Sequence, residues 1–221
     1  MQKWLRHHSG ALVLCLSVAL VLFAKGVFSP RMAHAATQVS VFQFHGNSAL
    51  ANFDSFDTTG CIETSVILAG GDSITLTRPG TGGPQQSPII VAEIAQFNNC
   101  TGFSLLNAVA ISNVANFHLA ANLSSATLTA SQIATVNEVT GTPFNLSVTM
   151  TWAGTGSITR EATPFNFSVP GLRVNGIVVG FTRAAVATGT ITDGTTNFTP
   201  TPSTSAMVSK VTSGEITITQ G

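Results

Sequence analysis

The stretch FNLSVTMTW, residues 144–152, carries the pattern that decides the fold class. Its hydrophobic residues alternate with hydroxyl-bearing ones, Val148, Met150 and Trp152 against Ser147, Thr149 and Thr151. Successive side chains of a β-strand point to opposite faces of the sheet. The alternation therefore predicts a strand with one buried face and one face in water, as is common in antiparallel sheets.

Similar runs rich in Val, Ile, Thr and Phe recur on both sides of this stretch, separated by Gly, Asn, Asp and Pro. Besides 144–152, we expect strands at 37–44, 61–69, 72–78, 88–97, 116–123, 125–131, 173–182, 185–192 and 213–220. The composition predicts turns at 70–71, 154–157 and 193–197, and longer irregular loops at 78–88 and 199–205. A short helix competes with a strand at 105–112.

Many antiparallel strands at short spacing predict an all-β fold. We expect an antiparallel two-sheet β-sandwich, immunoglobulin-like or jelly-roll-like, as a single domain over residues 36–221, with a barrel as the less favoured fold. No fixed-period repeat is evident, so a solenoid is not expected.

Residues 1–35 have the features of a secretory signal peptide. A basic start that includes Lys3 and Arg6 precedes the uncharged apolar run 11–24, and small residues precede a cleavage site after Ala35. The apolar run is shorter than the roughly 20 residues that a spanning helix needs, although the leader could instead remain as an uncleaved anchor. We expect a secreted or cell-surface protein with no membrane span after cleavage.

Cleavage changes the net charge. Four of the nine Lys and Arg lie in the leader, and all nine acids follow it, so the mature chain has five basic minus nine acidic residues, or −4. Nucleic-acid binding depends on clustered Lys and Arg and is not expected. The 44% hydrophobic and 8% charged composition is that of a folded chain.

Two cysteines, Cys61 and Cys100, remain after the leader. Export to an oxidising compartment favours a disulfide between them. Zinc would need about four ligands, and only His45 and His118 could join the two thiolates. The two cysteines could also be free thiols, or one of them could be a nucleophile with a His partner.

Three carboxylates, Asp54, Asp57 and Glu63, gather within residues 52–63. They are weak candidates for a cation or acid site, because a hard cation such as calcium prefers carboxylate and carbonyl oxygens. Their spacing does not match a helix–loop–helix calcium loop, and solvated acids near a turn are the favoured interpretation.

Elsewhere in the sequence, residue combinations typical of catalytic or ligand-binding sites are scarce. No GxSxG motif is present, and His118 lies between Phe117 and Leu119, as a strand residue facing solvent would. A carbohydrate site with stacked aromatics is disfavoured, because the chain has no Tyr and Trp152 is the only Trp after the leader. No catalytic residue and no cofactor are expected, although a secreted hydrolase with a cryptic carboxylate or His site is an alternative.

We expect a non-catalytic structural or binding protein of unknown ligand, with self-association or an extracellular protein as partner. An apolar cavity within a Phe-rich barrel, binding a lipophilic molecule, is another option.

In composition the chain resembles the pilins assembled by chaperone and usher, on the strength of Cys61, Cys100 and the alternating TQVSVFQF at 37–44. The resemblance implies an immunoglobulin-like fibre subunit in which 37–44 completes a neighbour's sheet. The C-terminal GEITITQG lacks the aromatic residue usual near the end of such subunits.

Overall fold

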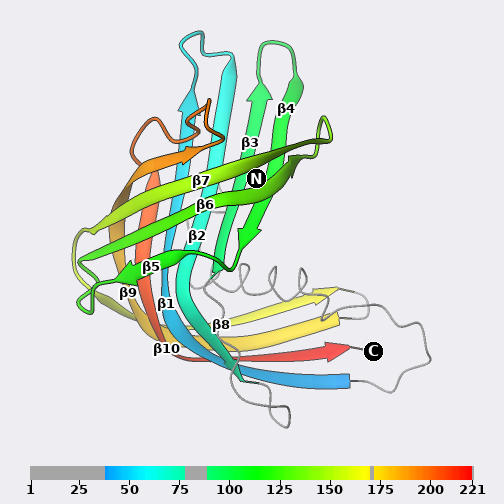
Figure 1. Cartoon of the computed structure of the whole chain (residues 1–221). Coiled ribbons are helices and arrows are strands. Elements are labelled where there is room, and N and C mark those ends of the chain that lie inside the picture. Colours follow the sequence, from blue (N-terminus) through cyan, green and yellow to red (C-terminus); the bar gives the residue numbers. More distant parts are fainter. Residues whose placement is uncertain (1–37, 78–88, 170–171, 221) are drawn as a thin grey trace.

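A computed structural model describes residues 38–77, 89–169 and 172–220. Within these ranges the chain forms ten β-strands and no helix (Figure 1). The strands are β1 (Gln38–Phe56), β2 (Ile62–Thr77), β3 (Ile89–Asn98), β4 (Phe103–Ser112), β5 (Asn116–Leu119), β6 (Ser125–Asn137), β7 (Thr142–Gly154), β8 (Thr159–Val169), β9 (Leu172–Thr192) and β10 (Ser205–Gln220). The predicted signal peptide, its cleavage site and the predicted loop 78–88 lie outside the described residues.

The strands join into one open antiparallel sheet in the order β4-β3-β2-β1-β10-β9-β7-β6-β5, and β8 pairs with β9 beside this path. The prediction of an all-β antiparallel fold is confirmed. The two-sheet division of the predicted sandwich is not confirmed, because hydrogen-bonded strand pairs connect both halves. The sheet is also not closed, so the expectation of a barrel as the less favoured fold is wrong.

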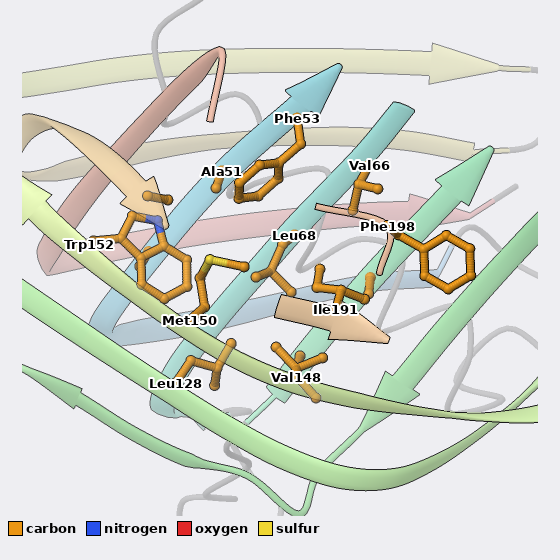
Figure 2. Close-up of a cluster of buried hydrophobic side chains, with 14 of the residues drawn as sticks. Ala51, Phe53, Val66, Leu68, Leu128, Val148, Met150, Trp152, Ile191 and Phe198 are labelled. Carbon is orange, nitrogen blue, oxygen red and sulfur yellow. The ribbon is translucent and has the colours of Figure 1, made fainter. Parts of the chain in front are cut away.

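Both walls of the core come from this single sheet, which folds over on itself so that β6 and β7 cross in front of β2 and β3 (Figure 1). From one wall, Phe53 and Leu68 point inward, and from the other Met150 and Trp152 face them (Figure 2). The Trp152 indole N–H donates to the Leu50 carbonyl oxygen at 2.9 Å. The predicted alternation of 144–152 is confirmed, since Val148, Met150 and Trp152 are buried.

The free edge of β4 is covered by side chains of β6 instead of a paired strand. Asn137 donates from Nδ2 to the Leu105 carbonyl at 3.1 Å and accepts from the Asn107 N–H at 3.4 Å. Thr135 donates to the Val109 carbonyl at 2.9 Å, and the Glu138 N–H donates to the Asn107 carbonyl at 2.7 Å. We call these contacts the β4–β6 seam. The seam satisfies edge groups that would otherwise invite pairing with another chain.

The long strands β1, β9 and β10 continue beyond the folded-over part into an arm with β8 (Figure 1). The bend coincides with register shifts between Phe44 and Gly46 in β1 and between Val211 and Ser213 in β10. β-Bulges of this kind bend strands and increase their twist.

Several predicted boundaries are wrong. Gly70 and Gly71 lie inside β2 and not in a turn, so the expected strands 61–69 and 72–78 are one strand. Asp54 and His45 belong to β1, and Asp57 lies in the turn that follows it. The segment 105–112 is strand β4, so the helical alternative is wrong, and β8 was not anticipated.

Candidate functional site: the outer face around the disulfide

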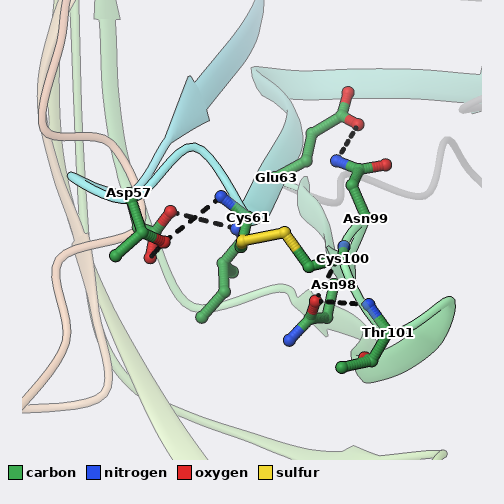
Figure 3. Close-up of a disulfide and its surroundings, with 9 residues drawn as sticks. Asp57, Cys61, Glu63, Asn98, Asn99, Cys100 and Thr101 are labelled. Carbon is green, nitrogen blue, oxygen red and sulfur yellow. Dashed lines mark hydrogen bonds between the residues drawn. A yellow bond between two sulfur atoms is a disulfide. The ribbon is translucent and has the colours of Figure 1, made fainter.

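Cys61 and Cys100 form a disulfide, with their Cα atoms 5.3 Å apart (Figure 3). It links the turn between β1 and β2 to the turn between β3 and β4. The predicted bond is confirmed, so neither sulfur is a free thiol. By loop-closure entropy, a bond across 39 residues stabilises the fold by about 4 kcal/mol. A disulfide also indicates an oxidising location.

Hydrogen bonds fix both linked turns. The Asp57 carboxylate accepts from the Ile62 N–H at 3.0 Å and from the Thr59 hydroxyl at 2.7 Å. In the second turn, Asn98 Oδ1 accepts from the N–H groups of Cys100 and Thr101, both at 3.0 Å (Figure 3). These side chain to backbone bonds make the disulfide end of the molecule a defined surface.

The three acids singled out in the sequence each bond to their own neighbours. Asp54 accepts from the hydroxyls of Ser65 at 3.0 Å and Thr204 at 3.1 Å. Glu63 accepts from the Asn99 amide at 3.3 Å. Across 38–77, 89–169 and 172–220, no group of three or more His, Cys, Asp or Glu is placed to share a metal ion.

The Asp57 carboxyl has a pKa below its ordinary value of 3.8. The largest cause is the hydrogen bond from the Ile62 N–H, followed by that from Thr59. This carboxylate is therefore suited to closing the turn and unsuited to donating a proton as a general acid near neutral pH.

The outer face of β1–β4 is the side of these strands turned away from the core. Ala49, Ala51 and Phe53 are buried, so Leu50 and the alternate residues after it lie on the outer side. One row of cross-strand partners runs over five strands on this side: Met207, Leu50, Ala69, Val91 and Ile111. We call it the apolar row. Its members are half-buried, except Ile111, which is 38% exposed.

Aromatic and acidic side chains lie beside the apolar row. Glu63 pairs with Phe56 on one side and Phe97 on the other, and these two are 59% and 42% exposed. Glu93 pairs with Val109, which is 38% exposed. The sequence has no Lys, Arg or His at 47–77 or 89–112. The outer face thus combines exposed apolar surface with acids alone, and exposed patches of this kind mark interaction sites.

His45, His118 and the β8 carboxylate Glu161 do not belong to the outer face of β1–β4. His118 is exposed on β5, as expected, and His45 is exposed on β1. Away from the outer face, a surface hollow is lined in part by Glu161, Thr182 and Ser209. Glu161 accepts from the Thr182 hydroxyl at 3.0 Å, and its buried Oε2 has no hydrogen-bond partner among the described residues. Glu161 is the one carboxylate among the described residues lining the hollow, whereas glycoside hydrolysis uses two.

The sequence pointed to the disulfide but not to the apolar row. The five residues of that row come from five strands, and single-sequence patterns do not specify strand register. The one signal in the sequence was the absence of basic residues at 47–77 and 89–112.

None of the described residues belongs to a helix with the length and apolar character needed to cross a bilayer. Comparison of the chain with protein-family models, with curated proteins and with solved structures gives no match.

Proposed function

We propose that this chain is a non-catalytic binding protein, secreted or displayed at the cell surface, and that the outer face of β1–β4 is its binding surface. The observation that carries the proposal is the apolar row, flanked by exposed Phe56 and Phe97 and by acids without a basic neighbour in the same strand segments. Partly exposed apolar side chains on a hydrogen-bonded sheet favour docking of a protein surface.

The disulfide and the leader-like composition of residues 1–35 support this location. Disulfides persist in secreted and surface proteins and are rare in reducing compartments. The bond holds the two hairpins of the binding surface in a fixed relation before a partner arrives, and such preorganisation lowers the entropic cost of binding.

A hydrolase is less well supported. Asp54, Asp57 and Glu63 each accept hydrogen bonds from neighbouring side chains or backbone groups, which gives all three a structural role. Acid–base catalysis instead needs groups free to exchange protons with a substrate.

A fibre subunit that donates its N-terminal strand is also less well supported. Residues 38–44 already pair along 214–220 of the same chain, within one sheet. Donation to a neighbour would require this pairing to be released, so we favour association through an exposed face over strand exchange.

The proposal is tested by placing a photo-crosslinking amino acid at Val109 on the outer face, or at Thr149 on the exposed side of β7 as a control. Each full-length variant is produced in the source cells, irradiated and analysed by mass spectrometry. We expect a covalent adduct from position 109 and none from position 149. No adduct at 109, or the same adducts at both positions, would show that the outer face is not a binding surface.

A further inference from the structure

The charged residues of the described chain are unevenly distributed, with acids alone on β1–β3 and an excess of bases on β8–β10. Five acids lie on β1–β3 and the turn after β1: Asp54, Asp57, Glu63, Asp72 and Glu93. The four Lys and Arg of the described residues all lie on β8–β10, Arg160, Arg173, Arg183 and Lys210, where they outnumber the two acids of these strands, Glu161 and Glu215. The molecule therefore has an acidic and a basic region, although its formal net charge is zero over the full chain.

The basic region contains an exposed row of its own. Phe181 on β9 pairs with Arg160 on β8 and with Lys210 on β10, so a cation lies on each side of the aromatic ring position. Phe181 is 39% exposed, and Arg160 and Lys210 are exposed. Ile177, 45% exposed, lies on the same side of β9. We call Arg160, Phe181 and Lys210 the basic row.

Of the five acids on β1–β3 and the turn after β1, Asp72 lies on the same side of the sheet as Lys210, because both pair with Asn47, whereas Asp54, Glu63 and Glu93 lie on the outer face. Lys210 pairs with Asn47, which lies on the same side of β1 as the core residues Ala49 and Ala51. Leu50 and Asp54 lie on the opposite side of that strand. The basic row and the outer face of β1–β4 are thus on opposite faces of the sheet, so only another molecule can bring them together.

We propose that the partner of the outer face is a second copy of this chain, which docks through its basic row. This proposal rests on the proposed function and names the partner of that same surface. Each surface combines apolar side chains with charges of one dominant sign: exposed phenylalanines and acids on the outer face, and Phe181 between two cations on the basic row. Arg and Lys interact favourably with carboxylates and with aromatic faces such as Phe56 and Phe97.

Because the two surfaces differ, the contact is heterologous. Each molecule keeps one free acidic face and one free basic row after the first contact, so association continues into rings or open chains. The partially charged character of the contact makes it sensitive to salt, since the Debye length falls from about 30 Å at 0.01 M to about 3 Å at 1 M ionic strength.

The test uses the purified full chain with its disulfide intact and two charge-reversed variants. The first, Arg160→Glu/Lys210→Glu, makes the basic row acidic. The second, Glu63→Lys/Glu93→Lys, replaces two acids of the outer face by cations. A control, Thr127→Glu/Thr149→Glu, adds two charges to exposed positions of β6 and β7, away from both surfaces. Native mass is measured by light scattering after size exclusion, and circular dichroism verifies the fold of each variant.

We expect multimers of the unmodified chain and of the control at low salt, with dissociation toward monomer at high salt. Like charges facing each other should weaken association of either reversed variant by about a hundredfold or more. An equimolar mixture of the two reversed variants should form multimers again, because each then offers the surface that the other needs. A structural defect alone would not be repaired by mixing.

A monomeric unmodified chain at low salt, or multimers unaffected by either reversal, overturns the second-copy proposal. If position 109 still gives an adduct with a different molecule in the source cells, the binding function stands and only the identity of the partner is wrong. If position 109 gives no adduct and the chain is monomeric, both proposals fail.

Discussion

At the residue scale, two adjacent positions in the middle of β2, Gly70 and Gly71, exclude a larger side chain for different reasons. A Cβ added to Gly71 would lie 2.7 Å from the Asn47 carbonyl oxygen, which belongs to the neighbouring strand. A Cβ added to Gly70 would lie 2.8 Å from Leu128 Cδ2, the end of a buried side chain on the facing wall. The backbone oxygen can move only with its strand, whereas the leucine can change rotamer.

We therefore expect Gly71→Ala to lower the free energy of unfolding by about 2–3 kcal/mol and Gly70→Ala by about 1 kcal/mol, both through overpacking. Urea unfolding followed by circular dichroism measures both values. An equal loss for the two variants, or a larger loss for Gly70→Ala, would contradict this explanation of the glycine pair.

Also at the residue scale, Asp57 should make the stability of the fold depend on pH through the turn after β1. Its pKa is lowered in the folded chain, chiefly by the Ile62 N–H. A depressed folded-state pKa means that the ionised carboxylate stabilises the fold above its unfolded pKa of about 3.8 and that this contribution disappears as pH falls through the lower folded value. Asp57→Asn should therefore be less stable than the unmodified chain at about pH 6, and the difference should shrink by about pH 2. Urea unfolding at both pH values tests this, and a constant difference would assign the effect to lost geometry instead of charge.

At the scale of elements, the β4–β6 seam replaces a missing strand pair. Asn137 supplies one donor and one acceptor to the edge of β4, and Thr135 supplies a second donor. These bonds, with that of the Asn107 side-chain amide to Glu138 and one backbone bond from the Glu138 N–H, hold the fold-over without a backbone ladder between these strands. This arrangement explains how one open sheet can enclose a core with two walls.

Removing the Asn137 side chain should open the seam. We expect Asn137→Ala to lower the free energy of unfolding by about 1–2 kcal/mol, since two hydrogen bonds are lost. Hydrogen exchange of the Asn107 amide should rise selectively, because its acceptor is Asn137 Oδ1. Asn145→Ala, at an exposed position of β7, is a matched control. Unchanged protection at Asn107 would mean that the seam bond does not limit opening of the β4 edge.

The elements also show what a single sequence can predict here. Alternation correctly predicted the strand at 144–152, because Val148, Met150 and Trp152 face the core while Thr149 and Thr151 between them face solvent. The pair Gly70–Gly71 was wrongly predicted as a turn, because Gly favours turns locally while strand packing required both residues in β2. The disulfide was predicted from the number of cysteines together with the expected export. The apolar row could not be predicted in this way, because it depends on the register of five strands.

At the scale of the whole molecule, the first and last strands lie side by side in the middle of the sheet. β1 pairs with β10 from Gln38 and Gln220 through Asn52 and Ser205. These pairs join the β1–β4 half of the sheet to the half that contains β5–β9. The central joint is therefore made by residues that are far apart in sequence, a non-local contact of the kind that slows folding.

This topology makes a circular permutant the sharpest test of the fold. Because Gln38 and Gln220 are paired neighbours, a short turn can connect them, and new ends can be placed in the exposed turn after Glu138. We expect this permutant to fold with a free energy of unfolding within about 2 kcal/mol of the linear chain.

A second permutant with the same connection, but opened between Phe181 and Thr182, interrupts β9 where both edges are paired. It should lose cooperative urea unfolding, because the cut removes the continuity of a strand that holds β8 and β10 together. Circular dichroism and urea unfolding compare the two. If the first permutant also fails to fold, β1 and β10 are not neighbours in the manner described, and the two halves of the sheet must be joined in another way.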